Sequence, residues 1–114
     1  MATTIHEICH AIESDNPAIY QSCLRFRNSR TVGETPQSLK KMTNLPYHPH
    51  EMAYRDRWEE TGNNVYCGKI YDQEGFTEIF TMGVQRFYED PVQFRQQDPE
   101  YFTLIVKLIR NLEV

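Results

Sequence analysis

The chain lacks a long hydrophobic run, a basic stripe and a disulfide framework, and each absence excludes a class of protein. No apolar run approaches the roughly 20 residues that span a bilayer, and no secretory signal region precedes the first motif, so a membrane or secreted protein is not expected. The net charge of −4 disfavours binding to nucleic acid or to an anionic membrane surface. The 3 cysteines form no CxxC motif, and their odd number favours reduced thiols in the cytoplasm.

The composition is that of a globular protein, with 39% hydrophobic and 25% charged residues. A length of 114 residues predicts one domain over residues 1–114. The motif with the clearest chemistry starts at residue 6, as it would in the C-terminal part of a longer domain.

Hydrophobic periodicity and turn residues divide the chain into predicted elements. Helices are expected where apolar residues recur at three- and four-residue spacing: 2–14, 17–30, 75–88, 91–97 and 99–112. Residues 31–50 contain one glycine and three prolines and are expected to form an irregular connection. Residues 52–58 and 65–71 favour extended structure around a turn at 61–64, which predicts a β-hairpin. The predicted fold class is α+β, mainly helical with a β-hairpin or small antiparallel sheet.

Residues 6–10 read His-Glu-Ile-Cys-His, an HExxH motif. Two histidines four residues apart lie on one face of a helix and can bind a single zinc ion. His6 and His10 have this spacing, which predicts Zn²⁺ as the cofactor. Glu7 stands where a glutamate can act as general base on the metal-bound water without binding the metal.

The same helix carries an apolar stripe formed by Ile5, Ile8 and Ile12. At about 100° per residue, this stripe lies roughly opposite the two imidazoles. We therefore expect the helix to bury its isoleucines and to present both histidines to a cleft.

Catalytic zinc takes three protein ligands and one water, so the motif requires a third ligand from elsewhere. The extended metzincin spacing is excluded because the chain has Glu13 and Asn16 where that class has glycine and histidine. Glu78 is the leading candidate, since a carboxylate buried in its apolar segment would need a cationic partner. His48 and His50, flanked by prolines, form a weaker alternative pair.

Further residues are candidates for supporting roles. Glu13 follows the second histidine by one turn and could orient an imidazole by a hydrogen bond. A donor near the metal would stabilise the oxyanion of hydrolysis, and Tyr54, Arg55, Tyr66 and Tyr71 in the predicted hairpin are candidates. The absence of a second ExxH unit from the sequence excludes a di-iron helical bundle.

Several short motifs follow HExxH-x-x-E in order: Asn-Pro, Gly-Glu-x-Pro, Tyr-Arg-Asp, Gly-Lys-x-Tyr, Thr-Glu-x-x-x-Met-Gly and Asp-Pro-Glu-Tyr-Phe. HExxH-x-x-E occupies residues 6–13. The motifs that follow it occupy residues 16–17, 33–36, 54–56, 68–71, 77–83 and 98–102. This arrangement resembles the zincin-type domain of phage head-morphogenesis and related mobile-element polyproteins, over nearly the whole chain. The resemblance implies a zincin-like fold in which Zn²⁺ is bound by His6, His10 and Glu78, with Glu7 as the base.

The leading hypothesis is a zinc-dependent peptidase-like domain that hydrolyses a peptide or protein substrate through a zinc-bound water. The alternative is a non-catalytic, zinc-stabilised interaction or assembly module on the same scaffold. Zincin peptidases usually place a β-sheet before the HExxH helix, and this chain has no room for one there. We therefore expect that the hairpin substitutes for it, that an upstream segment or a second copy of the chain completes the sheet, or that cleavage is impaired.

Overall fold

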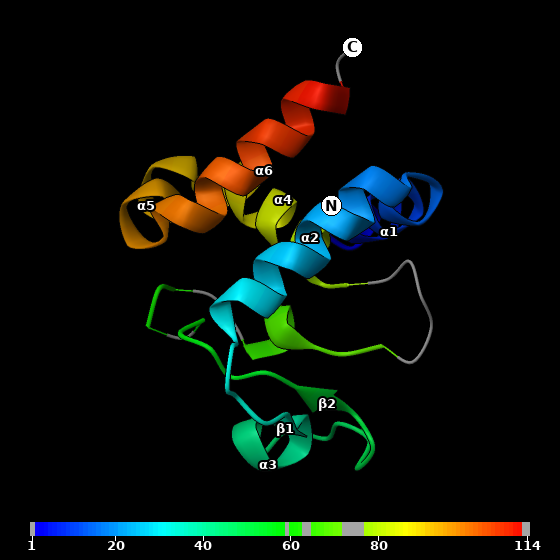
Figure 1. Ribbon diagram of the computed structural model, residues 1–114, viewed down its shortest axis with the longest axis vertical. Helices are drawn as coiled ribbons and strands as arrows, with labels where there is room; N and C mark the ends of the chain where they lie inside the picture. The colour runs from blue at the N-terminus through cyan, green and yellow to red at the C-terminus, as the bar shows by residue number, and fades with distance from the viewer. Residues whose placement is uncertain (1, 59, 63–64, 72–76, 113–114) are drawn as a thin grey trace.

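The computed structural model describes residues 2–58, 60–62, 65–71 and 77–112. Its elements are α1 (Ala2–Asp15), α2 (Pro17–Arg30), β1 (Gln37–Ser38), α3 (Leu39–Thr43), β2 (Met52–Ala53), the 3₁₀ helix η1 (Val65–Gly68), α4 (Ile79–Glu89), α5 (Pro91–Gln97) and α6 (Pro99–Leu112). Figure 1 shows the longer helices grouped together, with β1, β2 and α3 at one end of the molecule. The chain is thus mainly helical with a small antiparallel sheet, as predicted. In the described part of the chain, no helix has the length and apolar character needed to cross a membrane.

Three helices, α2, α5 and α6, start at an Asn-Pro or Asp-Pro step, a pattern that is typical of a capping residue followed by the first helical position. Asp90 before α5 accepts a hydrogen bond from the backbone N–H three residues later, at 3.1 Å, and Asp98 before α6 does the same at 3.3 Å. Asn16 precedes the proline of α2 but makes no such cap; its side-chain amide instead donates to the carbonyl oxygen of Ile12, at 2.7 Å. Asn16 therefore satisfies a carbonyl oxygen in the last turn of α1 instead of capping α2.

The buried face of α1 differs from the predicted one. Ile8 is 53% exposed and Ile12 is only partly buried, whereas Cys9 and Glu13 are buried against the core. A buried carboxylate needs hydrogen-bond donors, and Glu13 finds them in the segment that leads into α4. This contact turns the polar side of α1 inward, so the prediction of a buried isoleucine stripe is wrong for Ile8; the side chain of Ile5 lies outside the described residues.

Helix α4 lies at the centre of the fold and packs against α1, α2, α5 and α6. The main core consists of buried residues from these helices and from the loops around η1: Cys9, Ile19, Cys23, Trp58, Cys67, Ile79, Phe80, Phe94, Tyr101, Ile105 and Leu108. A smaller cluster of Leu39, Ala53 and Val65 lies at the sheet. Since α4 contacts both α1 and the loop region, its N-terminus is where these parts of the chain meet.

Gly83 allows α4 to approach α6 closely. A Cβ atom at this position would lie 2.4 Å from Cδ1 of Ile105 and 2.8 Å from Cε1 of Tyr101. We expect Gly83→Ala to lower the free energy of unfolding by about 1–2 kcal/mol, because overpacking costs about 1–3 kcal/mol and alanine recovers up to about 1 kcal/mol in helix propensity. Urea denaturation measures the change. Adding Ile105→Val should recover part of the loss, and a stabilising Gly83→Ala would contradict the close approach.

In the part of the chain that the structure describes, the predicted pairing of residues 52–58 with 65–71 is confirmed at a single antiparallel bridge and not along a full hairpin. β2 pairs antiparallel with β1, with Gln37 opposite Ala53, and residues 65–68 form η1 instead of a strand. Among the described residues, the two predicted strands meet at an antiparallel bridge between Ala53 and Lys69. Residues 56–58 and 60–62 turn inward and bury Trp58, which leaves too little extended chain for two paired strands. The predicted turn at 61–64 lies partly outside the described residues.

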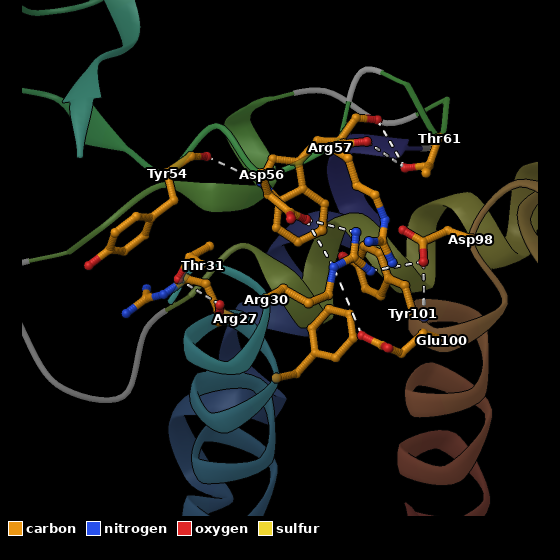
Figure 2. Close-up of polar contacts among 12 residues, drawn as sticks. Arg27, Arg30, Thr31, Tyr54, Asp56, Arg57, Thr61, Asp98, Glu100 and Tyr101 are labelled. Carbon is orange, nitrogen blue, oxygen red and sulfur yellow. Dashed lines mark hydrogen bonds and ion pairs between the residues drawn. The ribbon is translucent and has the colours of Figure 1, made fainter. Parts of the chain in front are cut away.

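Arg30 at the end of α2 joins that helix to the loop after β2 and to α6. Its guanidinium lies 2.7 Å from the carboxylate of Asp56 and 2.8 Å from that of Asp98, and the three side chains are 4%, 6% and 1% exposed. Figure 2 shows the guanidinium between the two carboxylates. The same group lies 4.9 Å from the ring centre of Phe26 and 4.8 Å from that of Trp58. This buried network holds the loop region against the helices.

Candidate metal centre

His6 and His10 lie one turn apart on α1, and their rings approach each other. Their Nε2 atoms are 3.1 Å apart, and the ring centres are 4.6 Å apart in an edge-to-face arrangement. The side chains are 28% and 22% exposed. The four-residue spacing therefore brings both nitrogens to one point on the helix surface, which solvent can reach.

Glu78 reaches the histidines from the start of α4. The residue is fully buried, with Oε1 lying 3.3 Å from Nε2 of His6 and Oε2 lying 3.3 Å from Nε2 of His10. The helix predicted to begin at residue 75 begins at Ile79, with Glu78 as its N-cap; residues 75 and 76 lie outside the described residues. The non-helical backbone at Glu78 directs its carboxylate toward α1.

The spacing of these ligand atoms fits a zinc ion. Two ligands about 2.0–2.1 Å from zinc and separated by the tetrahedral angle lie about 3.3 Å from each other. Nε2 of His6 and Nε2 of His10 lie 3.1 Å apart, and each lies 3.3 Å from a different oxygen of the Glu78 carboxylate. With one ligand atom from each residue, the three atoms lie within 4.8 Å of one another. Two imidazoles and one carboxylate are also a donor set that catalytic zinc sites use. Because both histidines are partly exposed, an ion held by these residues would remain accessible to a water molecule.

Two hydroxyl groups fix the carboxylate of Glu78 in this position. Thr81 donates to Oε1 at 2.8 Å, and the hydroxyl of Tyr71 donates to Oε2. Such hydrogen bonds orient a metal-binding carboxylate and limit its rotation. Tyr71 is among the residues singled out from the sequence, whereas Thr81 is not. Thr81 lies three residues after Glu78, the N-cap of α4. Its contact with Glu78 can be predicted only when the start of α4 is known.

The charges at this centre depend on one another. The hydrogen bond to Glu78 raises the pKa of His10, although burial opposes it. Burial would raise the pKa of Glu78, but hydrogen bonds from His10, Tyr71 and Thr81 outweigh it and hold that pKa below its usual value. Burial and the bond to Glu78 raise the pKa of Tyr71, so its hydroxyl stays protonated. The lowered pKa of Glu78 favours its carboxylate anion, the raised pKa of His10 favours its protonated form, and a metal cation would compete with that proton.

Glu13 is expected from the sequence to orient an imidazole, but its carboxylate is hydrogen-bonded to Thr77. Its carboxylate accepts hydrogen bonds from the backbone N–H and the hydroxyl of Thr77, at 2.8 and 2.5 Å. Glu13 is fully buried, and this burial raises its pKa against the opposing effect of the Thr77 bonds. Glu13 therefore fixes the residue directly before Glu78. The two partners are 64 positions apart in the chain, so no local sequence signal predicts their contact.

Glu7, the predicted general base, lies exposed on α1 beside the histidines. In the described part of the chain it has no hydrogen-bond or ion-pair partner. Its carboxylate is therefore available to a water molecule or to a substrate group that approaches the metal centre.

The other tyrosines singled out from the sequence lie farther from the metal centre. The ring of Tyr54 packs under Arg27, 5.6 Å from the guanidinium carbon. Tyr66 stacks on Tyr47 with ring centres 5.9 Å apart, and it is hydrogen-bonded to Tyr71. Among the described contacts of these three tyrosines, the one with a candidate ligand is the hydrogen bond from Tyr71 to Glu78.

The weaker ligand candidates also lie apart. His48 and His50 are exposed loop residues with ring centres 4.8 Å apart. Cys9 is buried, and burial raises the pKa of its thiol to about 11, so the thiol stays protonated at neutral pH. Within the described ranges, the group able to hold a metal consists of two histidines of α1 and the carboxylate before α4.

A scan against protein-family models finds no match for this chain, and neither does a search of curated proteins or of solved structures. The likeness to phage head-morphogenesis zincins therefore stays a prediction that rests on the sequence motifs. The candidate metal centre is therefore defined by the positions and donor atoms of His6, His10 and Glu78.

Proposed function

We propose that this chain is a zincin-like, zinc-dependent peptidase domain in which His6, His10 and Glu78 bind Zn²⁺. The observation that supports the proposal is the convergence of two imidazole nitrogens and a buried carboxylate at separations of 3.1 to 3.3 Å. Glu78 is fully buried with its carboxylate facing both imidazoles, and a zinc ion held between them would add the positive charge that favours a buried carboxylate.

The roles of the residues follow from their positions. A zinc ion bound here would act as a Lewis acid on the substrate carbonyl and would lower the pKa of a water molecule. Glu7 would take a proton from the attacking water and return it to the amine nitrogen as the C–N bond breaks. Tyr71 would hold Glu78 in place and is the candidate tyrosine best positioned to donate toward the oxyanion.

A zinc-stabilised interaction module without hydrolytic activity is the second candidate. β1 and β2 are only two residues long, so the described sheet offers a short edge to a substrate strand. This shortness favours a role in which another protein or a second copy of the chain completes the sheet. Both candidates require bound zinc, and they differ in whether a peptide bond is cleaved.

Metal content tests what the two candidates share. Protein purified without a histidine tag should contain about one equivalent of zinc, and His10→Ala should contain almost none, because one of three protein ligands is removed. Mass spectrometry of the metals in the purified protein measures both values. His48→Ala is the matched control, since His48 lies in an exposed loop outside the metal centre, and it should retain the metal. Equal zinc in wild type and His10→Ala, or none in either, would refute the site.

A further inference from the structure

A cleft beside Tyr71 plays no part in the metal chemistry proposed above. It has a volume of about 480 Å³ and lies between the connection before β2 and the segment after η1. The lining residues that carry its chemistry are His48, His50, Glu51, Met52, Lys69 and Tyr71. The cleft thus combines a fixed cation and two imidazoles with apolar surface.

Lys69 is held in place by three groups. Its Nζ atom lies 2.7 Å from Oε1 of Glu51, donates to the hydroxyl of Tyr66 at 3.4 Å, and lies 4.6 Å from the ring centre of Tyr71. Its side chain is 13% exposed. An ammonium has three N–H donors, and in the described part of the chain these hydrogen bonds use two of them. Counted over the described residues, one N–H donor of Lys69 therefore remains for a ligand in the cleft.

Glu51 indicates which ligand chemistry suits the cleft. One carboxylate oxygen accepts from Lys69, and the other accepts from the backbone N–H of His48 at 2.9 Å. A carboxylate is thus already bound at this point by a side-chain ammonium and a backbone N–H. The side chain of Glu51 is 27% exposed, so a second carboxylate can approach Lys69 from solvent beside it. The apolar surfaces of Met52 and Tyr71 suit the methylene groups of a glutamate side chain.

Tyr71 connects this cleft to the metal centre. Its hydroxyl donates to Glu78, and its ring centre lies 6.4 Å from that of His10. The ring also forms part of the cleft wall under Lys69. A peptide that crosses Tyr71 can therefore place one side chain in the cleft and a neighbouring peptide bond near the histidines.

We infer that this cleft binds an acidic side chain of a peptide, with Lys69 as the cation that receives it and Glu51 as the internal carboxylate that competes with it. The assignment of this peptide as a substrate rests on the proposed function, whereas its binding does not. Lys69 would then determine specificity for peptides that carry glutamate or aspartate beside the cleavage site.

Fluorescence anisotropy with labelled peptides tests the inference. The probes are eight-residue alanine-serine peptides in which one glutamate is moved through each position, and a matched set carries glutamine at the same positions. The protein is the full chain in the presence of zinc, with Glu7→Gln to prevent cleavage. At the favoured position we expect about tenfold tighter binding of the glutamate peptide, as for a hydrogen bond between charged groups.

Substitutions at Lys69 and Glu51 should change the preference for glutamate over glutamine in opposite directions. Lys69→Met should abolish the preference for glutamate over glutamine, and Lys69→Arg should keep it because the charge is retained. Glu51→Gln should increase the preference, since the competing charge is lost while the amide oxygen can still accept from His48. Lys107→Met, at an exposed position of α6, is the matched control and should change nothing.

The outcomes separate this inference from the proposed function. Equal binding of both peptide sets at every position, no measurable binding at all, or a preference that survives Lys69→Met would overturn the role of the cleft. Zinc content and peptide hydrolysis are measured on the parallel wild-type protein. Zinc and hydrolysis without a preference for glutamate would refute the cleft alone, whereas a preference that depends on Lys69 in a protein without zinc would refute only the metal centre.

Discussion

Replacing Arg30 by alanine is expected to lower the free energy of unfolding by about 4 kcal/mol, within the roughly 3–5 kcal/mol measured when one partner of a buried ion pair is removed. The variant leaves Asp56 and Asp98 buried without their cation, at 6% and 1% exposure. It also removes the guanidinium from the faces of Phe26 and Trp58. Urea unfolding followed by the fluorescence of the single tryptophan measures the change.

Arg25→Ala provides the control on the same helix. Arg25 is exposed and makes a 3.4 Å hydrogen bond to the side chain of Ser22, so its loss should change stability by less than about 0.5 kcal/mol. A loss below about 1 kcal/mol in Arg30→Ala would mean that water or a rearranged loop solvates both carboxylates, and the buried network would then not hold the loop region.

The grouping of His6, His10 and Glu78 is the part of the candidate site that sequence patterns predict best. The spacing of His6 and His10 fixes their relative position on any helix, so the pair follows from the sequence alone. Glu78 follows from the cost of burying a carboxylate in an apolar segment. Thr81 and the contact between Glu13 and Thr77 do not follow, because they depend on where α4 begins and on how α1 packs against it.

The fold shows the same division between local and distant interactions. The helix starts at Asp90 and Asp98 are local and agree with the sequence pattern. The orientation of α1 is not local, since the hydrogen bonds of Glu13 outweigh the burial of Ile8. The pairing of β2 with β1 depends on the inward turn that buries Trp58, and alternation of residue types in two short segments cannot reveal that turn.

Glu7→Gln is expected to reduce peptide hydrolysis by about 10²- to 10⁴-fold, the usual contribution of a general base. Glutamine has nearly the same shape but cannot take a proton from water. Glu7 is exposed and is not one of the three predicted ligands, so zinc content should be unchanged and the free energy of unfolding should shift by less than about 0.5 kcal/mol. Turnover of a fluorogenic peptide library by the zinc-loaded protein measures the rate, and metal analysis and urea denaturation complete the comparison.

Glu89→Gln near the end of α4 matches this substitution on an exposed surface away from the metal centre, so it should keep full activity. The comparison distinguishes the two proposed functions because both require zinc and only one requires a base. If wild type binds zinc and cleaves no peptide in the library, the zinc-stabilised interaction module is the better description. If wild type and Glu7→Gln cleave at the same rate, hydrolysis does not depend on this carboxylate, and the peptidase mechanism proposed for Glu7 is wrong even if the metal centre stands.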